Sequence, residues 1–138
     1  MGIVHKQIGR HGDFAWEGVR TEPYRGDGVS EGSFRTVLIG PNEGAPHFAI
    51  RYFEIPPNGQ SSFEQHVHDH GIVILRGRAR VRLGAEEQEV AAGDAIYIPP
   101  NEPHQFQSIG DEPLGFLCVI PSKDLLDRGP RPELDARR

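Results

Sequence analysis

Cysteine and lysine are almost absent from this chain of 138 residues, which contains one cysteine and two lysines. The single cysteine, Cys118, allows neither a disulfide within the chain nor a zinc site built from several thiolates. The lysines, Lys6 and Lys123, lie near the two ends, so we expect no catalytic lysine of the Schiff-base type. Cysteine this scarce is typical of a reducing compartment, and the expected location is therefore the cytoplasm.

Long hydrophobic runs are also missing. The longest aliphatic run, residues 72–75, is far too short to cross a bilayer. The first residues contain no apolar stretch, so we expect no secretory signal peptide. The net charge of −5 disfavours nucleic acid as a partner. The sequence thus predicts a protein that binds neither membranes nor nucleic acid.

Glycine and proline, by contrast, are abundant: 17 glycines and 12 prolines are spread through the chain. Such spacing is typical of many short strands joined by turns, and it predicts an all-β domain, either a jelly roll or another small closed barrel. The expected strands are residues 35–39, 47–55, 71–75, 79–83, 88–90, 95–98, 104–108 and 115–120. The expected organisation is an N-terminal segment (1–34) that docks by a short strand, a barrel (35–121) and a polar tail with a short helix (122–138).

Histidines gather in one stretch, where His66, His68 and His70 follow Glu64 at alternate positions, and His104 lies further along the chain. Imidazole is a common ligand for first-row metals, and alternate residues of a strand point to the same side. The interior of a barrel tolerates so many polar groups only when something satisfies them. The pattern therefore predicts a metal site inside the barrel.

The residues alone leave two ligand sets open. If 63–66 and 70–75 form an antiparallel hairpin, a loop of ordinary length remains between them and His68 lies in that turn. On one continuous strand, the three alternate histidines would instead bind together, and Glu64 would lie outside the site.

The spacing around His104 resembles the second motif of the cupin superfamily: Gly, five residues, Pro-x-Gly, two residues, His, three residues, Asn. Here Gly93 begins the motif, Pro99 begins its Pro-x-Gly element and His104 occupies the histidine position. Asn101 stands where the family has its second glycine, and Ser108 stands where it has asparagine. Neither change touches the ligand that the resemblance implies.

The first cupin motif is present in an altered form. Counting back from its closing glycine, Gly77, places His70 where the family has glutamate. His66 takes the second histidine position, Glu64 takes the first, and Asn58 replaces the opening glycine. The resemblance implies a cupin-type jelly-roll barrel, also called a double-stranded β-helix. The metal ligands that it implies are Glu64, His66, His70 and His104.

Three imidazoles and one carboxylate suit one divalent transition metal per chain: Fe(II), Mn(II), Ni(II), Cu(II) or Zn(II). An octahedral metal would keep open positions for a small-molecule substrate or O₂. The expected function is a metal-dependent oxygenase of the dioxygenase type that acts on a small organic substrate. The alternatives are a non-redox isomerase or lyase, and a non-enzymatic binding or sensor protein. Small cupins commonly dimerise, so the resemblance also implies a homodimer, with the strand near 114–120 and the N-terminal segment as contacts.

The register also predicts the wall of the pocket. If His70 points inward, so do Ile72 and Ile74, and either Phe53 or Tyr52 lies nearby. The expected wall is mostly apolar. Arg51 is the cation on a strand that could anchor a substrate carboxylate, the alternative being an ordinary surface position. Cys118, in a hydrophobic strand, is expected to be a buried and inert thiol.

Overall fold

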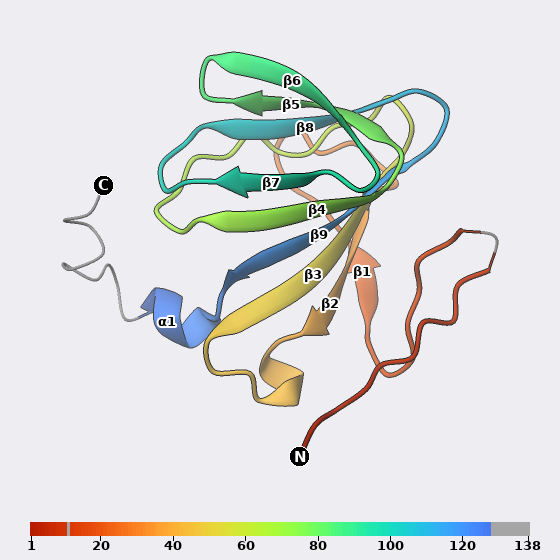
Figure 1. The fold of residues 1–138 in the computed structure, drawn as a ribbon, viewed down its shortest axis with the longest axis vertical. Coiled ribbons are helices and arrows are strands. Elements are labelled where there is room, and N and C mark those ends of the chain that lie inside the picture. Colours follow the sequence, from red (N-terminus) through yellow and green to blue (C-terminus); the bar gives the residue numbers. More distant parts are fainter. Residues whose placement is uncertain (11, 128–138) are drawn as a thin grey trace.

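The computed structural model describes residues 1–10 and 12–127, and this part of the chain folds into two antiparallel sheets that face each other across a core (Figure 1). One sheet has six strands in the order β1-β2-β3-β9-β4-β7, and the other has three in the order β6-β5-β8. The prediction of an all-β jelly-roll barrel is confirmed. The strands are β1 (Thr21–Pro23), β2 (Phe34–Ile39), β3 (Phe48–Ile55), β4 (His70–Arg76), β5 (Arg78–Leu83), β6 (Glu86–Ala91), β7 (Ala95–Ile98), β8 (His104–Ile109) and β9 (Leu114–Pro121).

Helical structure is limited to two short elements in the described residues: a 3₁₀ helix at Pro41–Glu43 and the helix α1 at Lys123–Asp127. No helix in this part of the chain has the length and hydropathy of a membrane span. Most of the predicted polar tail, residues 128–138, lies outside the described residues. At the other end, β1 pairs with β2 and extends the larger sheet at its edge.

The predicted hairpin between 63–66 and 70–75 is wrong. Glu64 instead exchanges two backbone hydrogen bonds of 2.9 Å with His104, so this segment runs beside β8 in the smaller sheet. The reason is that β4 already pairs with β7 on one side and with β9 on the other, which leaves it no free edge. The chain then crosses between the sheets through a bend at residues 67–68, and His68 lies in that bend.

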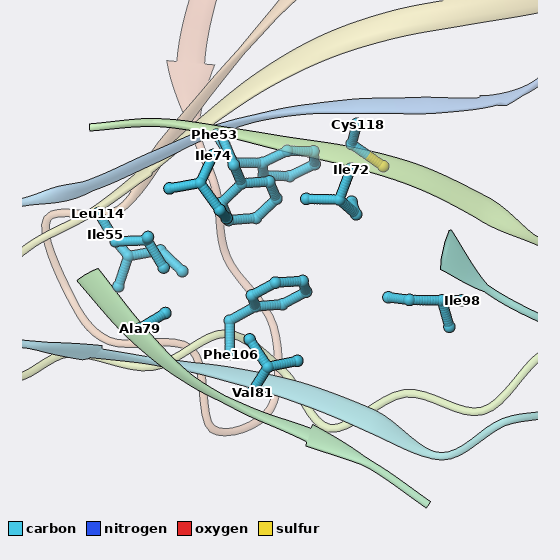
Figure 2. Packing of buried hydrophobic residues seen from close by; sticks show 11 residues of the cluster. Phe53, Ile55, Ile72, Ile74, Ala79, Val81, Ile98, Phe106, Leu114 and Cys118 are labelled. Carbon is cyan, nitrogen blue, oxygen red and sulfur yellow. The ribbon is translucent and has the colours of Figure 1, made fainter. Parts of the chain in front are cut away.

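The core fills the space between the two sheets (Figure 2). Phe116 stacks on Phe53 and on Phe106, with ring centroids 5.4 Å and 4.7 Å apart. Strand alternation sends Tyr52 to the opposite face of β3, where the ring packs on Phe14 and Trp16 of the N-terminal segment. The interior aromatic residue of β3 is therefore Phe53, the first of the two predicted alternatives.

The two asparagines that replace motif glycines both adopt left-handed backbone conformations, with φ of 63° at Asn58 and 64° at Asn101. Asparagine is one of the few residues other than glycine that visit this region readily. Gly77, in the turn between β4 and β5, has φ of 75°, and a Cβ there would overlap the carbonyl oxygen of Pro113. The two asparagines thus occupy turn positions whose backbone conformation glycine also adopts readily.

Candidate metal centre

Four side chains with metal-ligating atoms meet at one end of the barrel interior. His70 begins β4 and His104 begins β8, while Glu64 and His66 lie on the segment beside β8. One ligand atom from each residue lies within 4.8 Å of the others. Both strand histidines are buried, and the other two residues are partly buried. The structure thus brings together the four residues that the cupin resemblance implied as ligands, and we call Glu64, His66, His70 and His104 the candidate metal centre.

Ring nitrogens of the three histidines point to a common centre. The Nε2 atoms of His66 and His70 are 2.8 Å apart. Glu64 Oε2 lies 3.3 Å from Nε2 of His66 and 3.7 Å from Nε2 of His104. The carboxylate therefore lies among the imidazoles and supplies the negative charge that would offset part of the charge of a bound cation.

The other ring nitrogens of these histidines point away from the centre, each to its own partner. His66 Nδ1 donates to the backbone carbonyl of His68 over 2.8 Å, and His104 Nδ1 donates to the carbonyl of Glu102 over 2.8 Å. Since a carbonyl oxygen only accepts, Nδ1 carries the hydrogen in both rings, and in the neutral form of each ring the lone pair lies on Nε2. Outer partners of this kind orient the histidines that bind metals in proteins.

The pair formed by His66 and His70 gives the clearest test of fit. His70 Nδ1 lies 3.0 Å from Sγ of Cys118. When His70 donates from Nδ1, the lone pairs of the two Nε2 atoms face each other, an arrangement that a cation between them stabilises. Three imidazoles, one carboxylate and no thiolate among the converging atoms form the donor set of a first-row transition metal. The residues present therefore fit such an ion.

The contact between Glu64 and His104 favours the charged forms of both. The His104 ring, whose Nε2 lies 3.7 Å from the carboxylate, lowers the pKa of Glu64 to about 2, against the opposing effect of burial. Burial by itself would lower the pKa of His104, but the nearby carboxylate of Glu64 and the hydrogen bond to the carbonyl of Glu102 outweigh it and raise this pKa. Glu64 is therefore an ionised carboxylate at neutral pH, the state in which it can bind a metal.

Two histidines are held neutral. Burial, with the neighbouring His66 and His104 as smaller causes, lowers the pKa of His70 to about 3. Burial, followed by the charge of His66, also lowers the pKa of His68 to about 4. A neutral imidazole is the form that binds metals, so His70 is ready to act as a ligand without losing a proton at neutral pH.

His68 does not join the converging atoms in this structure. Its ring stacks on the ring of His66, with centroids 3.7 Å apart and planes 5° from parallel. The group of converging ligand atoms includes Glu64 in its place. The arrangement of the described residues is thus the first of the two predicted ligand sets, with His68 packed behind it at the bend.

Sequence reasoning missed a hydrogen-bonded chain that holds the carboxylate. Tyr24 Oη lies 2.8 Å from Ser62 Oγ, which donates to Glu64 Oε1 over 2.8 Å. Ser62 could have been found, because it lies two residues before Glu64 and therefore on the same side of an extended segment. Tyr24 lies in the N-terminal segment, and no local signal links it to residue 64.

A cavity of about 290 Å³ adjoins the candidate metal centre. Its wall holds the aromatic rings of Phe53, Phe106 and Phe116, as well as aliphatic side chains that include Ile72. The expectation of a mostly apolar wall is therefore confirmed. Two arginines, Arg35 and Arg51, also line the cavity. Cationic groups are therefore present in a wall that is mostly apolar outside the candidate metal centre.

Comparison with known proteins gives matches over most of the chain. Residues 51–120 match the cupin domain family. The chain is 38% identical over 109 residues to 1-methylthio-D-xylulose 5-phosphate methylsulfurylase from Rhodospirillum rubrum. This alignment covers 78% of this chain and 69% of that protein.

Two crystal structures extend this result. The polyketide cyclase RemF from Streptomyces resistomycificus superposes with a TM-score of 0.69 at 33% identity, over 75% of this chain and 74% of the cyclase. A cupin 2 conserved barrel domain protein from Rhodopseudomonas palustris has a TM-score of 0.72 at 32% identity, over 86% and 80% of the two chains. Since the family match spans half of the chain and contains the whole candidate metal centre, this protein belongs to the cupin superfamily.

Proposed function

We propose that this protein is a metal-dependent enzyme that holds one divalent transition metal at the candidate metal centre and acts on a small organic substrate in the adjoining cavity. One observation carries the proposal: four ligand atoms converge within 4.8 Å at the end of a cavity whose remaining wall is largely apolar. Four polar side chains that converge in a barrel interior are costly to bury, and a bound cation would be a counterpart that all four share. A metal with open coordination positions would supply a Lewis acid at the end of the substrate cavity.

The chain's own residues prepare this site. The backbone carbonyls of His68 and Glu102 orient two of the rings, and Ser62 holds one oxygen of Glu64. The apolar wall favours a substrate with an apolar body and keeps water away from the polar end. Glu64, ionised and partly buried, lines the polar end of the cavity, where its negative charge would offset part of the charge of the bound metal.

The finer reaction class is also a proposal. The relatives favour a reaction that needs no O₂, such as a lyase or isomerase reaction, because the two most fully named ones are a methylsulfurylase and a polyketide cyclase. The oxygenase predicted from the sequence is the second candidate. It is supported by the donor set, since three histidines and a carboxylate leave room at an octahedral metal for both a substrate and O₂.

Turnover with and without air tests both candidates. The metal-loaded protein is mixed with 1-methylthio-D-xylulose 5-phosphate, the compound for which the 38% identical relative is named, and with analogues, while an oxygen electrode follows O₂. We expect product by mass spectrometry at equal rates in air and under nitrogen, and none from His104→Ala. O₂ uptake that matches product would select the oxygenase. Full turnover after removal of the metal by a chelator would contradict the proposal.

We also propose that the protein forms a homodimer. Val73 and Val119, on neighbouring strands of the larger sheet, are 40% and 39% exposed, and they face away from the core. Ile3 and Val4 of the N-terminal segment are exposed as well. Burial of these side chains against a second copy would remove apolar surface from water. Sedimentation equilibrium should give twice the chain mass of 15.3 kDa, and a mass near that of one chain would contradict the proposal.

A further inference from the structure

Arg51 is a partly buried cation in the wall of the cavity. It lies on β3, directly opposite Cys118 on β9. Strand alternation places its side chain on the same face as Phe53, which belongs to the core. The alternative of an ordinary surface position therefore does not hold, and the guanidinium belongs to the interior.

The contacts of this guanidinium are few and weak. Its Nη2 donates to Cys118 Sγ over 3.4 Å, and its Cζ lies 4.8 Å from the ring centroid of Phe53. Its Nε is buried and has no hydrogen-bond partner. A guanidinium carries five N–H donors, so most of them have no partner among the described residues.

Other arginines of the interior surfaces are paired with carboxylates, and Arg51 is not. Arg35 Nε lies 2.9 Å from Glu22 Oε1, and Arg76 Nη1 lies 3.3 Å from Glu54 Oε1. In the part of the chain that the structure describes, no carboxylate lies within ion-pair distance of Arg51. A partly buried charge without a counter-ion has lost part of its hydration, so an anion from outside the chain would stabilise this position.

The position of Arg51 indicates that such an anion would belong to a small molecule in the cavity. Cys118 Sγ links the guanidinium to His70, with 3.4 Å on one side and 3.0 Å on the other. The cation is thus two contacts away from a ligand of the candidate metal centre. Phe53 and Phe116 line the same cavity. A small molecule could therefore reach the metal centre with one polar atom and the guanidinium with another, while its body lies on the rings.

We propose that Arg51 anchors an anionic group, a carboxylate or a phosphate, on the substrate that reacts at the metal centre. A guanidinium offers paired N–H donors that match the oxygens of both groups. That the molecule carrying this anion is a substrate rests on the proposed function. The anion site itself is formed without a metal.

Binding of matched probes tests this assignment. Calorimetry on the full chain, metal-loaded and again after chelation, compares benzoate with its neutral analogue benzamide. We expect wild-type protein to prefer benzoate in both states. Arg51→Gln should weaken benzoate about 10- to 100-fold, since a hydrogen bond to a charged group contributes that much, and should leave benzamide unchanged. Arg51→Lys should recover part of the preference. Phenyl phosphate in place of benzoate shows which of the two anions binds more tightly.

Two variants serve as controls. Arg80→Gln removes the same charge from an exposed strand face outside the cavity and should leave the preference for benzoate intact. Loss of the preference in Arg35→Gln but not in Arg51→Gln would overturn the proposal, as would a chelated wild-type protein that binds benzoate no better than benzamide up to millimolar concentrations. Metal content is measured on the same samples and tests the proposed function separately. If the protein binds no metal, the benzoate preference of the chelated protein still tests the anion site.

Discussion

The two ends of the barrel interior are built by the same strands but have opposite chemistry. At the end with the metal centre, β3, β4, β8 and β9 contribute Arg51, His70, His104 and Cys118. One inward position further along, the same strands contribute Phe53, Ile72, Phe106 and Phe116. The next inward positions hold Ile55, Ile74 and Leu114, with Ser108 as the one polar residue. The polar layer and the apolar layers are thus separated by a single inward step on each strand.

This difference shows how a small barrel can hold a reactive site without losing its core. The apolar layers bury residues such as Ile55 and Leu114 completely, and their burial supplies most of the stability. The polar layer is held by specific partners, such as the carbonyl of Glu102 for His104. We therefore expect substitutions in the polar layer to change metal binding and those in the apolar layers to change folding.

The largest effect is expected where the polar layer is broken. Removal of one ligand in His104→Ala should abolish the stabilisation that a metal gives the folded chain, about 4 kcal/mol at a concentration roughly 1,000 times the dissociation constant. Chemical denaturation with and without added metal measures this difference. A variant that gains as much stability from the metal as wild-type protein would show that His104 is not a ligand.

A break in the apolar layers should have a different signature. Ile74 is 1% exposed, and Ile74→Ala should lower the free energy of unfolding by roughly 3 kcal/mol, because the substitution removes buried methyl and methylene groups and leaves a cavity. Metal per folded chain should not change. Denaturation and elemental analysis on the same sample check both statements, and a loss of metal with intact stability would contradict the separation of the two layers.

Acid should destabilise the metal-free protein through histidines at and beside the candidate metal centre. The pKa values of His70 and His68 in the folded chain are about 3 and 4, below the ordinary 6.5. Between these values and 6.5, the unfolded chain binds protons at both histidines and the folded chain does not. Stability of metal-free protein should therefore fall as the pH drops from 6.5 towards 4, despite the opposite contribution of His104, whose pKa is raised. Urea denaturation at several pH values measures the slope. His68→Gln should make it shallower, and an unchanged slope would count against this assignment.

The smallest effect concerns the turn that precedes β8. Asn101 has a φ of 64°, and its N–H donates to the carbonyl of His66 over 2.7 Å. Asn101→Gly should change the stability by less than about 1 kcal/mol, whereas Asn101→Val should cost about 1–2 kcal/mol or more because a branched residue is strained there. Thermal unfolding compares the two variants, and equal melting temperatures would show that the left-handed turn is not required.

The sequence predicted most of the strands, because glycine, proline and alternating patterns mark them locally. It paired 63–66 with 70–75, which is wrong, because the partner of this segment depends on which edges the rest of the fold leaves free. The spacing of the cupin motifs predicted the four converging residues. This spacing is kept although His70 stands at the glutamate position of the motif and Glu64 stands at its first histidine position. The inward direction of Arg51 and the contact of Tyr24 with Ser62 depend on tertiary register, which carried no local signal.

Elemental analysis of protein purified without chelator or nickel resin tests the central claim most directly, when wild type is compared with Glu64→Ala and His68→Ala. We predict about one divalent transition metal per chain in wild type and in His68→Ala, and its loss in Glu64→Ala, because the ligand atoms that converge include Glu64 and not His68. Metal that persists in Glu64→Ala but is lost in His68→Ala, or no metal in wild-type protein, would contradict this account.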